Sequence, residues 1–198
     1  SKNSGKISGS SYIGGICGSN GLNTNCYMPY IERCENSGNV TSSSSYAGGI
    51  VGRCYSNNST SYFPKVNYCK NSGTIKGASY VGGISGSVYY NAYMSYNENT
   101  GNVTGTGSYA GGMVGYVNNG GSSYTTDMEH NINRGNITGV SYTGGICGYA
   151  NNYVHYYYCS NYGKVTSTGQ YIGGIIGSAG NYCYTQYCQN AGDVKSTY

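Results

Sequence analysis

The chain has 198 residues, of which only 8% are charged, and its net charge is +4. The ten Lys and Arg residues are scattered, without the basic stripe that a nucleic-acid-binding protein carries. No apolar stretch approaches the roughly 18 residues that cross a membrane as a helix. These features exclude a nucleic-acid partner and a membrane span from our expectations.

Two sequence phrases alternate along the chain. The first, Asn-x-Gly-x-(Ile/Val), begins at Asn3, Asn36, Asn71, Asn99, Asn133, Asn161 and Asn190, and the last copy is partial. The second, Tyr-x-Gly-Gly-(Ile/Met)-x-Gly, begins at Tyr12, Tyr46, Tyr80, Tyr109, Tyr142 and Tyr171. Self-similarity with a period between about 20 and 50 residues is typical of repeat architectures. The spacing predicts a single repeat domain over residues 1–198.

Each repeat predicts three short strands. The first surrounds the aliphatic residue of the Asn phrase, as at Val40, whose neighbours Asn39 and Thr41 are polar. Because side chains alternate between the faces of a strand, the aliphatic residue points inward and its neighbours outward. The second strand runs through the Tyr-Gly-Gly phrase, where the glycines suit a tight corner. The third precedes the next asparagine.

The pattern predicts an all-β fold, a β-solenoid that resembles a parallel β-helix with about six coils. Differences in repeat length fall in the stretches 19–30, 53–65 and 116–127, which are rich in Asn, Ser, Gly and Tyr. Variable length in one part of each repeat predicts loops on one corner of the solenoid. No window has the 3.6-residue apolar period of a helix.

The motifs resemble the GLUG-type repeats of bacterial cell-surface and secreted proteins. The clearest copy pairs Cys-Ser-Asn-Tyr-Gly-Lys-Val at residues 159–165 with Tyr-Ile-Gly-Gly-Ile-Ile-Gly at 171–177. The resemblance covers essentially the whole chain outside the variable loops. It implies a β-solenoid that serves as a stalk or display module in unlike proteins, and an extracellular or cell-surface location. The density of tyrosine in this chain departs from the family pattern.

The repeated asparagines are expected to stack as a ladder, with amides bonding from coil to coil. Two residues before them, Cys34 and Cys69 stack in neighbouring coils, as do Cys159 and Cys188. A strand spacing of about 4.8 Å suits a disulfide, but buried thiols packed as small apolar groups fit equally well. Cys26 and Cys54 are a third candidate pair. Nine cysteines favour an oxidising, extracellular location.

Nothing in the sequence indicates an active site. The six carboxylates come from different coils and positions in the repeat, whereas glycoside-cleaving sites need converging acids. His130 and His155 are expected to be solvated strand residues. No pair of cysteines has the two-residue separation of a zinc motif, and no histidine recurs beside them. We expect no enzyme, no metal and no cofactor.

Tyrosine is the abundant group without an obvious structural necessity. The six tyrosines that open the Tyr-Gly-Gly phrase are expected to form a stacked ladder at a corner. The others either pack or offer a contact surface, and the candidates are Tyr89, Tyr90, Tyr93, Tyr153, Tyr156, Tyr157, Tyr182 and Tyr184.

The favoured hypothesis is a non-catalytic extracellular structural solenoid. It would serve as a stalk, an adhesin segment or a filament subunit that assembles with itself, end to end or laterally. The expectation of end-to-end stacking rests on open sheet ends and on termini that match in repeat phase. The alternative is a module that binds a surface glycan or a host protein through the tyrosine-rich loop face.

Overall fold

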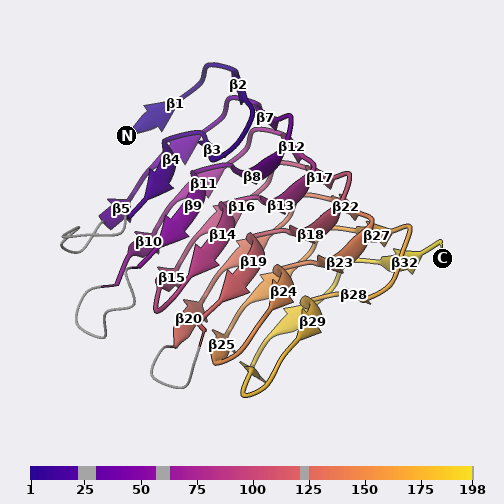
Figure 1. Ribbon diagram of the computed structural model, residues 1–198. Coiled ribbons are helices and arrows are strands. Elements are labelled where there is room, and N and C mark those ends of the chain that lie inside the picture. The colour runs from indigo at the N-terminus through magenta and orange to yellow at the C-terminus, as the bar shows by residue number, and fades with distance from the viewer. Residues whose placement is uncertain (22–29, 57–62, 121–124, 198) are drawn as a thin grey trace.

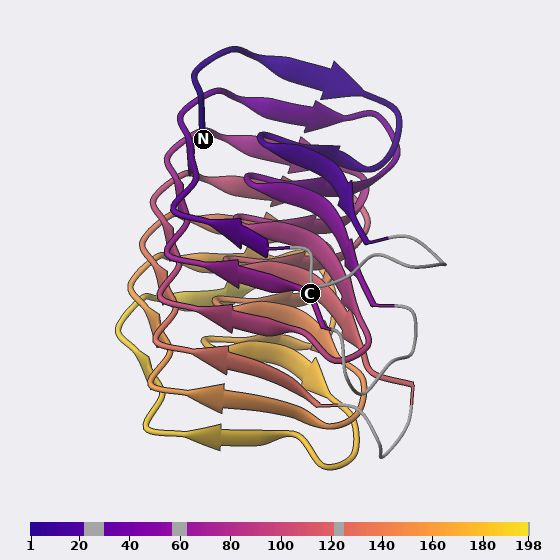
Figure 2. The same ribbon diagram turned by 90° about the vertical axis from the view of Figure 1, so that its left-hand side faces the viewer.

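The computed structural model of the protein describes residues 1–21, 30–56, 63–120 and 125–197. In these residues the chain forms a parallel β-solenoid without any helix, as the sequence predicts (Figure 1). Successive coils stack one upon the next, so that strands far apart in sequence lie side by side in register (Figure 2).

The strands of the described residues form five sheets, which we name A to E in chain order. Sheet A contains β1 (Lys2–Asn3), β6 (Glu35–Asn36), β11 (Lys70–Asn71), β16 (Glu98–Asn99), β21 (Ile132–Asn133), β26 (Ser160–Asn161) and β31 (Gln189–Asn190). Sheet B contains β2 (Ile7–Gly9), β7 (Val40–Ser42), β12 (Ile75–Gly77), β17 (Val103–Gly105), β22 (Ile137–Gly139), β27 (Val165–Ser167) and β32 (Val194–Ser196).

The other three sheets have six strands each. Sheet C contains β3 (Ile13–Gly14), β8 (Ser45–Gly48), β13 (Ser79–Gly82), β18 (Ser108–Gly111), β23 (Ser141–Gly144) and β28 (Ile172–Gly173). Sheet D contains β4 (Cys17–Asn20), β9 (Val51–Tyr55), β14 (Ser85–Tyr89), β19 (Val114–Asn118), β24 (Cys147–Ala150) and β29 (Ile176–Ala179). Sheet E contains β5 (Tyr30–Glu32), β10 (Lys65–Asn67), β15 (Tyr93–Ser95), β20 (Thr126–Glu129), β25 (Val154–Tyr157) and β30 (Tyr184–Gln186).

A full coil therefore has five strands, where the sequence pattern predicted three. The Tyr-Gly-Gly phrase is divided between two strands, because the chain bends at its glycines between sheets C and D. The stretch before each asparagine is divided as well, because a corner at residues such as Tyr68 and Cys69 separates sheets E and A. The short-strand pattern is right, but the corners are more numerous than the apolar spacing reveals.

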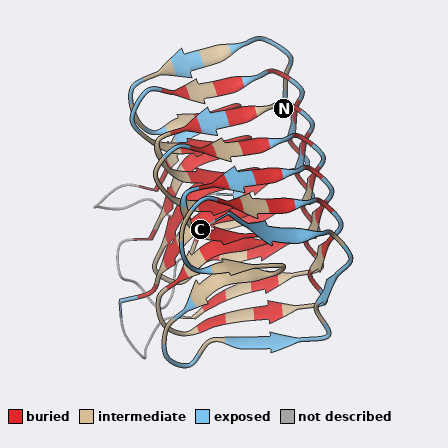
Figure 3. Ribbon diagram, turned by 90° about the vertical axis from the view of Figure 1, so that its right-hand side faces the viewer, coloured by how far each residue is buried: buried red, intermediate tan, exposed pale blue. Residues whose placement is uncertain are grey.

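The interior contains two apolar columns. One is built from the aliphatic residues of sheet B with small residues of sheet C, such as Val40 and Ala47. The other contains Ile50, Ile84 and Met113 from the Tyr-Gly-Gly phrases, with inward residues of sheets D and E. Burial is most complete in the middle coils, and the last coil is largely exposed (Figure 3). Each coil packs against the coils before and after it, and together they bury a core that one coil could not bury alone.

The corner before each Gly-Gly pair is formed by a tyrosine in the left-handed region of backbone space. Tyr46 has φ of 64° and Tyr109 has φ of 68°. The glycines serve a different purpose, which is close approach: a Cβ on Gly49 would lie 2.2 Å from the Gly83 carbonyl oxygen and 2.4 Å from Asn71 Cγ. The repeated glycines therefore let the asparagine side chain cross the interior beside the bend.

Candidate functional site

The surface of sheet A carries a row of alternating charges on four consecutive coils. We name Lys2, Glu35, Lys70 and Glu98 the charged row; each residue is aligned with the next in the parallel register. Lys2 Nζ lies 2.8 Å from Glu35, and Lys70 Nζ lies 3.6 Å from Glu98. The Lys2 ammonium, through its hydrogen bond, holds the pKa of Glu35 below its usual range. Arg134, which follows the ladder asparagine of the next coil and lies outside the row, also approaches Glu98, with its Nε 3.2 Å from the carboxylate.

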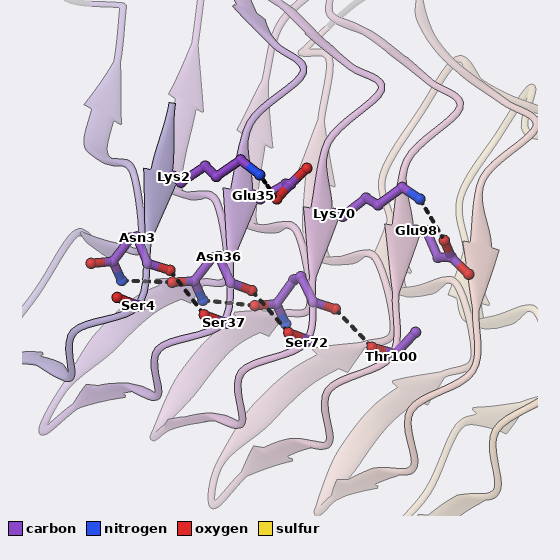
Figure 4. Close-up of a pocket in the computed structure, with 11 residues that line it drawn as sticks. Lys2, Asn3, Ser4, Glu35, Asn36, Ser37, Lys70, Ser72, Glu98 and Thr100 are labelled. Carbon is purple, nitrogen blue, oxygen red and sulfur yellow. Dashed lines mark hydrogen bonds and ion pairs between the residues drawn. The ribbon is translucent and has the colours of Figure 1, made fainter.

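A groove of about 470 Å³ runs beside the charged row (Figure 4). Its opposite wall is formed by the residues that follow the ladder asparagines, Ser4, Ser37, Ser72 and Thr100. The hydroxyls of Ser37 and Thr100 donate to backbone carbonyls of the preceding coil, at 3.3 Å each. The groove is thus polar on both walls, and its charged wall has both signs.

The asparagine side chains form an unbroken ladder through the interior. Each Nδ2 group donates to the Oδ1 atom of the asparagine in the next coil at 2.7–2.8 Å, from Asn3 to Asn190. Each Nδ2 also donates to the carbonyl of its own turn, as Asn99 does to Gly101. From Asn36 to Asn161 these side chains are almost completely buried. The amides therefore have a structural position, in agreement with the expected ladder, and are not an accessible row.

The tyrosines that open the Tyr-Gly-Gly phrase form the stacked column expected from the sequence. Successive rings from Tyr12 to Tyr171 have centroids 4.6–5.1 Å apart. Arg53 and Tyr116 on sheet D lie against this column, with the Arg53 guanidinium 4.5 Å from the Tyr12 ring centroid. The ring faces are occupied by neighbouring rings, so the column presents ring edges and hydroxyls to solvent.

A second aromatic column stands at the corner between sheets E and A, and the sequence pattern did not reveal it. We name it the corner column: Tyr68, Tyr96, His130, Tyr158 and Tyr187. Its centroids are 4.7–5.0 Å apart with interplanar angles of 4–10°, and its members have φ between 50° and 54°. The signal was available, because every member stands three residues before a ladder asparagine.

The tyrosines named as a candidate contact surface do not form one surface. Tyr89 packs with Tyr55 and Tyr116 on the outside of sheet D. Tyr153 stacks on Tyr182 at 4.8 Å. The others divide as follows: Tyr90 and Tyr157 are half-buried, Tyr93 donates a hydrogen bond to Glu129, and Tyr182 and Tyr184 are exposed.

Tyr156 is wrong as a contact residue, because it lies fully buried in the larger apolar column. It is aligned with Met128, which is aligned with Met94, so the alternation of β25 turns it inward. Its hydroxyl lies beside the Cys147 thiol, and burial raises its pKa. The position in the repeat, shared with those methionines, indicated the inward orientation.

The candidate disulfides, one of the two alternatives that the sequence left open, are not formed in the structure. Cys34, Cys69, Cys159, Cys188 and Cys54 are free thiols, and Cys26 lies outside the described residues. The physical reason is visible in the middle coils, where Asn97 and Asn131 occupy the cysteine position and donate to the carbonyls of Val66 and Met94. The thiols of Cys69 and Cys188 do the same and donate to the carbonyls of Ile31 and Tyr156.

The thiols differ strongly in acidity. Burial raises the pKa of Cys54 and Cys147 to about 12. The hydrogen bond from Cys159 lowers the pKa of Cys188 to about 7, and Cys188 is only half-buried. Because the thiolate is the reactive species, Cys188 is the described cysteine best placed to react.

Titratable groups also meet on the outer face of sheet E. His155 Nδ1 lies 3.2 Å from an Asp127 carboxylate oxygen, and Tyr93 donates to Glu129. Burial raises the pKa of Asp127, with His155 opposing the shift. His155 therefore lies in an ion-pair position, whereas His130 belongs to the corner column.

Over the described residues, no group of three or more His, Cys, Asp or Glu side chains could hold a metal ion. The same residues contain no helix long and apolar enough to cross a membrane.

Comparison with known proteins supports the fold. No family model and no curated protein sequence matches the chain. Among solved structures, it is similar to a proposed immunoglobulin A1 protease from Bacteroides ovatus, with a TM-score of 0.63 and 20% sequence identity. The match covers 93% of this chain and 60% of that one, so the chain spans about 60% of the length of its structural neighbour. At this identity the likeness shows a shared β-solenoid architecture.

Proposed function

We propose that the chain is a non-catalytic structural segment of an extracellular or cell-surface protein, a rigid spacer of the stalk or adhesin type built from GLUG-type repeats. The observation that carries this proposal is the asparagine ladder. It continues without interruption from Asn3 to Asn190, so each coil is fixed to the next by the same side-chain hydrogen bond. Such nearest-neighbour contacts give a rod whose length scales with coil number.

The spacer role is tested by measuring distance. Tandem fusions of one, two and three copies of the chain, joined so that the ladder phase continues, would carry a donor and an acceptor dye at the two ends. A rigid spacer increases the dye separation linearly with coil number, by about 4.8 Å per coil. A separation that grows with the square root of length, as for a flexible linker, would contradict the proposal.

The non-catalytic part of the proposal has its own test. The structural neighbour is described as an immunoglobulin A1 protease, so human immunoglobulin A1 is the substrate to try. We expect the antibody heavy chain to remain intact after prolonged incubation with the purified chain, as judged by gel electrophoresis. Specific cleavage fragments would overturn the assignment as a non-catalytic segment.

Electron microscopy of the purified chain separates the spacer form from the filament form of the hypothesis. Discrete particles at high protein concentration would support a spacer, whereas long fibres would support end-to-end assembly through open sheet edges.

A binding role is the second candidate, and the exposed tyrosines of the last coil favour it. Tyr182, Tyr184 and Tyr187 are 49–74% exposed. Tyrosine supplies an amphipathic contact face at low entropic cost. The test is binding to a glycan or host-protein array. Loss of binding when Tyr184 and Tyr187 are changed to Ala would establish the binding role. Retention of binding would show that these residues do not belong to the binding surface.

A further inference from the structure

The charged row is not required by the fold. In the same row of sheet A, the later coils have Ile132, Ser160 and Gln189, and the ladder beside them is equally complete. The chain has only ten basic and six acidic residues in all. Lys2, Glu35, Lys70 and Glu98 nevertheless occupy four consecutive positions of one surface row, with 30–78% of each side chain exposed.

The order of the charges makes this row complementary to itself in one orientation. We propose that the charged row is the contact surface of a lateral, antiparallel dimer of two copies of this chain. A two-fold axis across the row, between Glu35 and Lys70, brings Lys2 opposite Glu98 of the second copy and Glu35 opposite its Lys70. Each of the two basic residues of the charged row then faces an acidic residue of the row in the second copy, which is the isologous arrangement of a two-fold dimer.

The parallel orientation in the same register is excluded by the same charges. Two rows facing each other in parallel register place Lys2 opposite Lys2 and Glu35 opposite Glu35, and like charges held together repel. Complementary charges fix register and orientation more than they supply affinity. A parallel shift by one coil leaves one charge of each row unmatched, so antiparallel pairing is the arrangement that matches all four charges. The groups beside the row supply the remaining contact.

The flanks of the row fit this arrangement. Two residues before the charged positions stand Arg33, Tyr68 and Tyr96, and both tyrosine rings are about half exposed. The two-fold rotation places Arg33 of one copy at the level of Tyr68 of the other. The Arg33 guanidinium already lies 6.0 Å from the Tyr68 ring centroid within one chain. An arginine with an exposed aromatic ring is a common contact pair at interfaces.

The proposal predicts a salt-sensitive dimer. The Debye length falls from about 10 Å at 0.1 M salt to about 3 Å at 1 M, so exposed charges attract each other much less at high salt. We expect the intact chain to sediment as a monomer–dimer equilibrium at low salt and as a monomer at high salt. A monomer at every salt and protein concentration would overturn the proposal.

Charge-reversal variants give the sharper test. By symmetry E35K places two pairs of like charges in the dimer, and so does K70E, so each variant alone should dimerise at least about tenfold more weakly. The E35K row has the signs plus, plus, plus, minus, and the K70E row has plus, minus, minus, minus. In antiparallel alignment these two rows are fully complementary. An equimolar mixture of E35K and K70E should therefore recover a dimer that neither variant forms alone.

Two controls separate this surface from general effects of charge and stability. K76E makes the same charge change on the exposed face of sheet B, away from the row, and should dimerise like the unchanged chain. E35K also removes the ion pair with Lys2, which could lower the stability of the chain. Thermal unfolding of every variant is therefore measured to show that the fold persists. Failure of the mixture to recover dimers, with all variants folded, would overturn the proposal, as would a K76E variant that loses the dimer.

Discussion

Many non-glycine residues of this solenoid adopt the left-handed backbone conformation, because the chain turns a corner at their positions. The described residues include sixteen non-glycine residues with positive φ, and eleven of these are the Tyr and His members of the two aromatic columns. A residue held in such a region costs about 1–3 kcal/mol. A stacked aromatic pair returns about 0.5–1.5 kcal/mol, and an interior ring has two such neighbours. Stacking and strain are therefore of similar size, which explains aromatic residues where glycine is usual.

Among the described cysteines, Cys188 should be the first to be alkylated. The hydrogen bond from Cys159 lowers its pKa to about 7, whereas burial raises the pKa of Cys54 and Cys147 to about 12. Brief treatment of the folded chain with iodoacetamide at neutral pH, followed by peptide mass spectrometry, should show label on Cys188 before the other two. Changing Cys159 to Ala removes the donor and should slow the labelling. Equal labelling of Cys54 and Cys188 would contradict the assignment.

Asp127 should make stability depend on pH. Burial raises its pKa above the ordinary value of about 3.9, so the folded chain holds this proton more tightly than the unfolded chain does. The stabilisation of the folded chain that Asp127 contributes is fully present below its ordinary pKa, and it is lost as pH rises through the raised pKa. The thermal midpoint of Asp127→Asn, compared with the unchanged chain across this range, should lack that decline. Asp193→Asn, at an exposed position, is the matched control.

At the scale of elements, the ladders determine the register. Each strand of sheet A is only two residues long, so its backbone bonds alone fix little. The asparagine side chain adds a bond to the next coil and one to its own turn, and the corner column adds ring contacts on the other side. A slip of one residue would turn the amide out of the interior, because side chains alternate between faces.

Replacing one buried ladder asparagine should be costly. Asn99→Ala leaves the amide of Asn71 without its acceptor and the Asn133 oxygen without its donor. A buried polar group without a partner costs about 1–3 kcal/mol, so we expect a loss of roughly 3 kcal/mol in the free energy of unfolding. Chemical denaturation measures it. Asn102→Ala, at an exposed position in the same repeat, should cost less than about 1 kcal/mol, and equal losses would show that the ladder is not the stabilising feature.

At the scale of the whole molecule, each coil touches only its two neighbours, so the coils act as units. The core is continuous along the stack, but no residue in the middle coils depends on a particular sequence at a distant coil. One coil can therefore be exchanged for another or removed, provided that the chain is rejoined at the same position of the repeat.

Removal of one complete coil should be tolerated. Deleting residues 99–132 joins Glu98 to Asn133 and lets Asn71 donate to Asn133, because the removed stretch equals the 34-residue step of the ladder. We expect a folded chain with an unchanged circular dichroism spectrum, shorter by about one strand spacing of 4.8 Å in small-angle scattering. Deleting residues 99–115 interrupts the phase and should unfold the neighbouring coils. Loss of structure in the full-coil deletion would contradict the repeat energetics.

The amino-acid sequence by itself determined the solenoid, its coil count and the inward aliphatic residues. Residues such as Val40 and Ile75 recur in a fixed phase between polar neighbours, and a period-two pattern has only one way to bury them. The asparagine position follows from the same repetition. Tyr156 was also decided at this level, since its place in the repeat is that of Met128, although its residue type pointed the other way.

Only the tertiary structure decided where the corners lie and which surface residues meet. A tyrosine in the left-handed region looks the same in sequence as one in a strand, so the five strands per coil emerge only from the backbone. The charged row has the same origin. Steps of 33, 35 and 28 residues separate its members in sequence, and the stacking of coils turns those unequal steps into equal distances along one face.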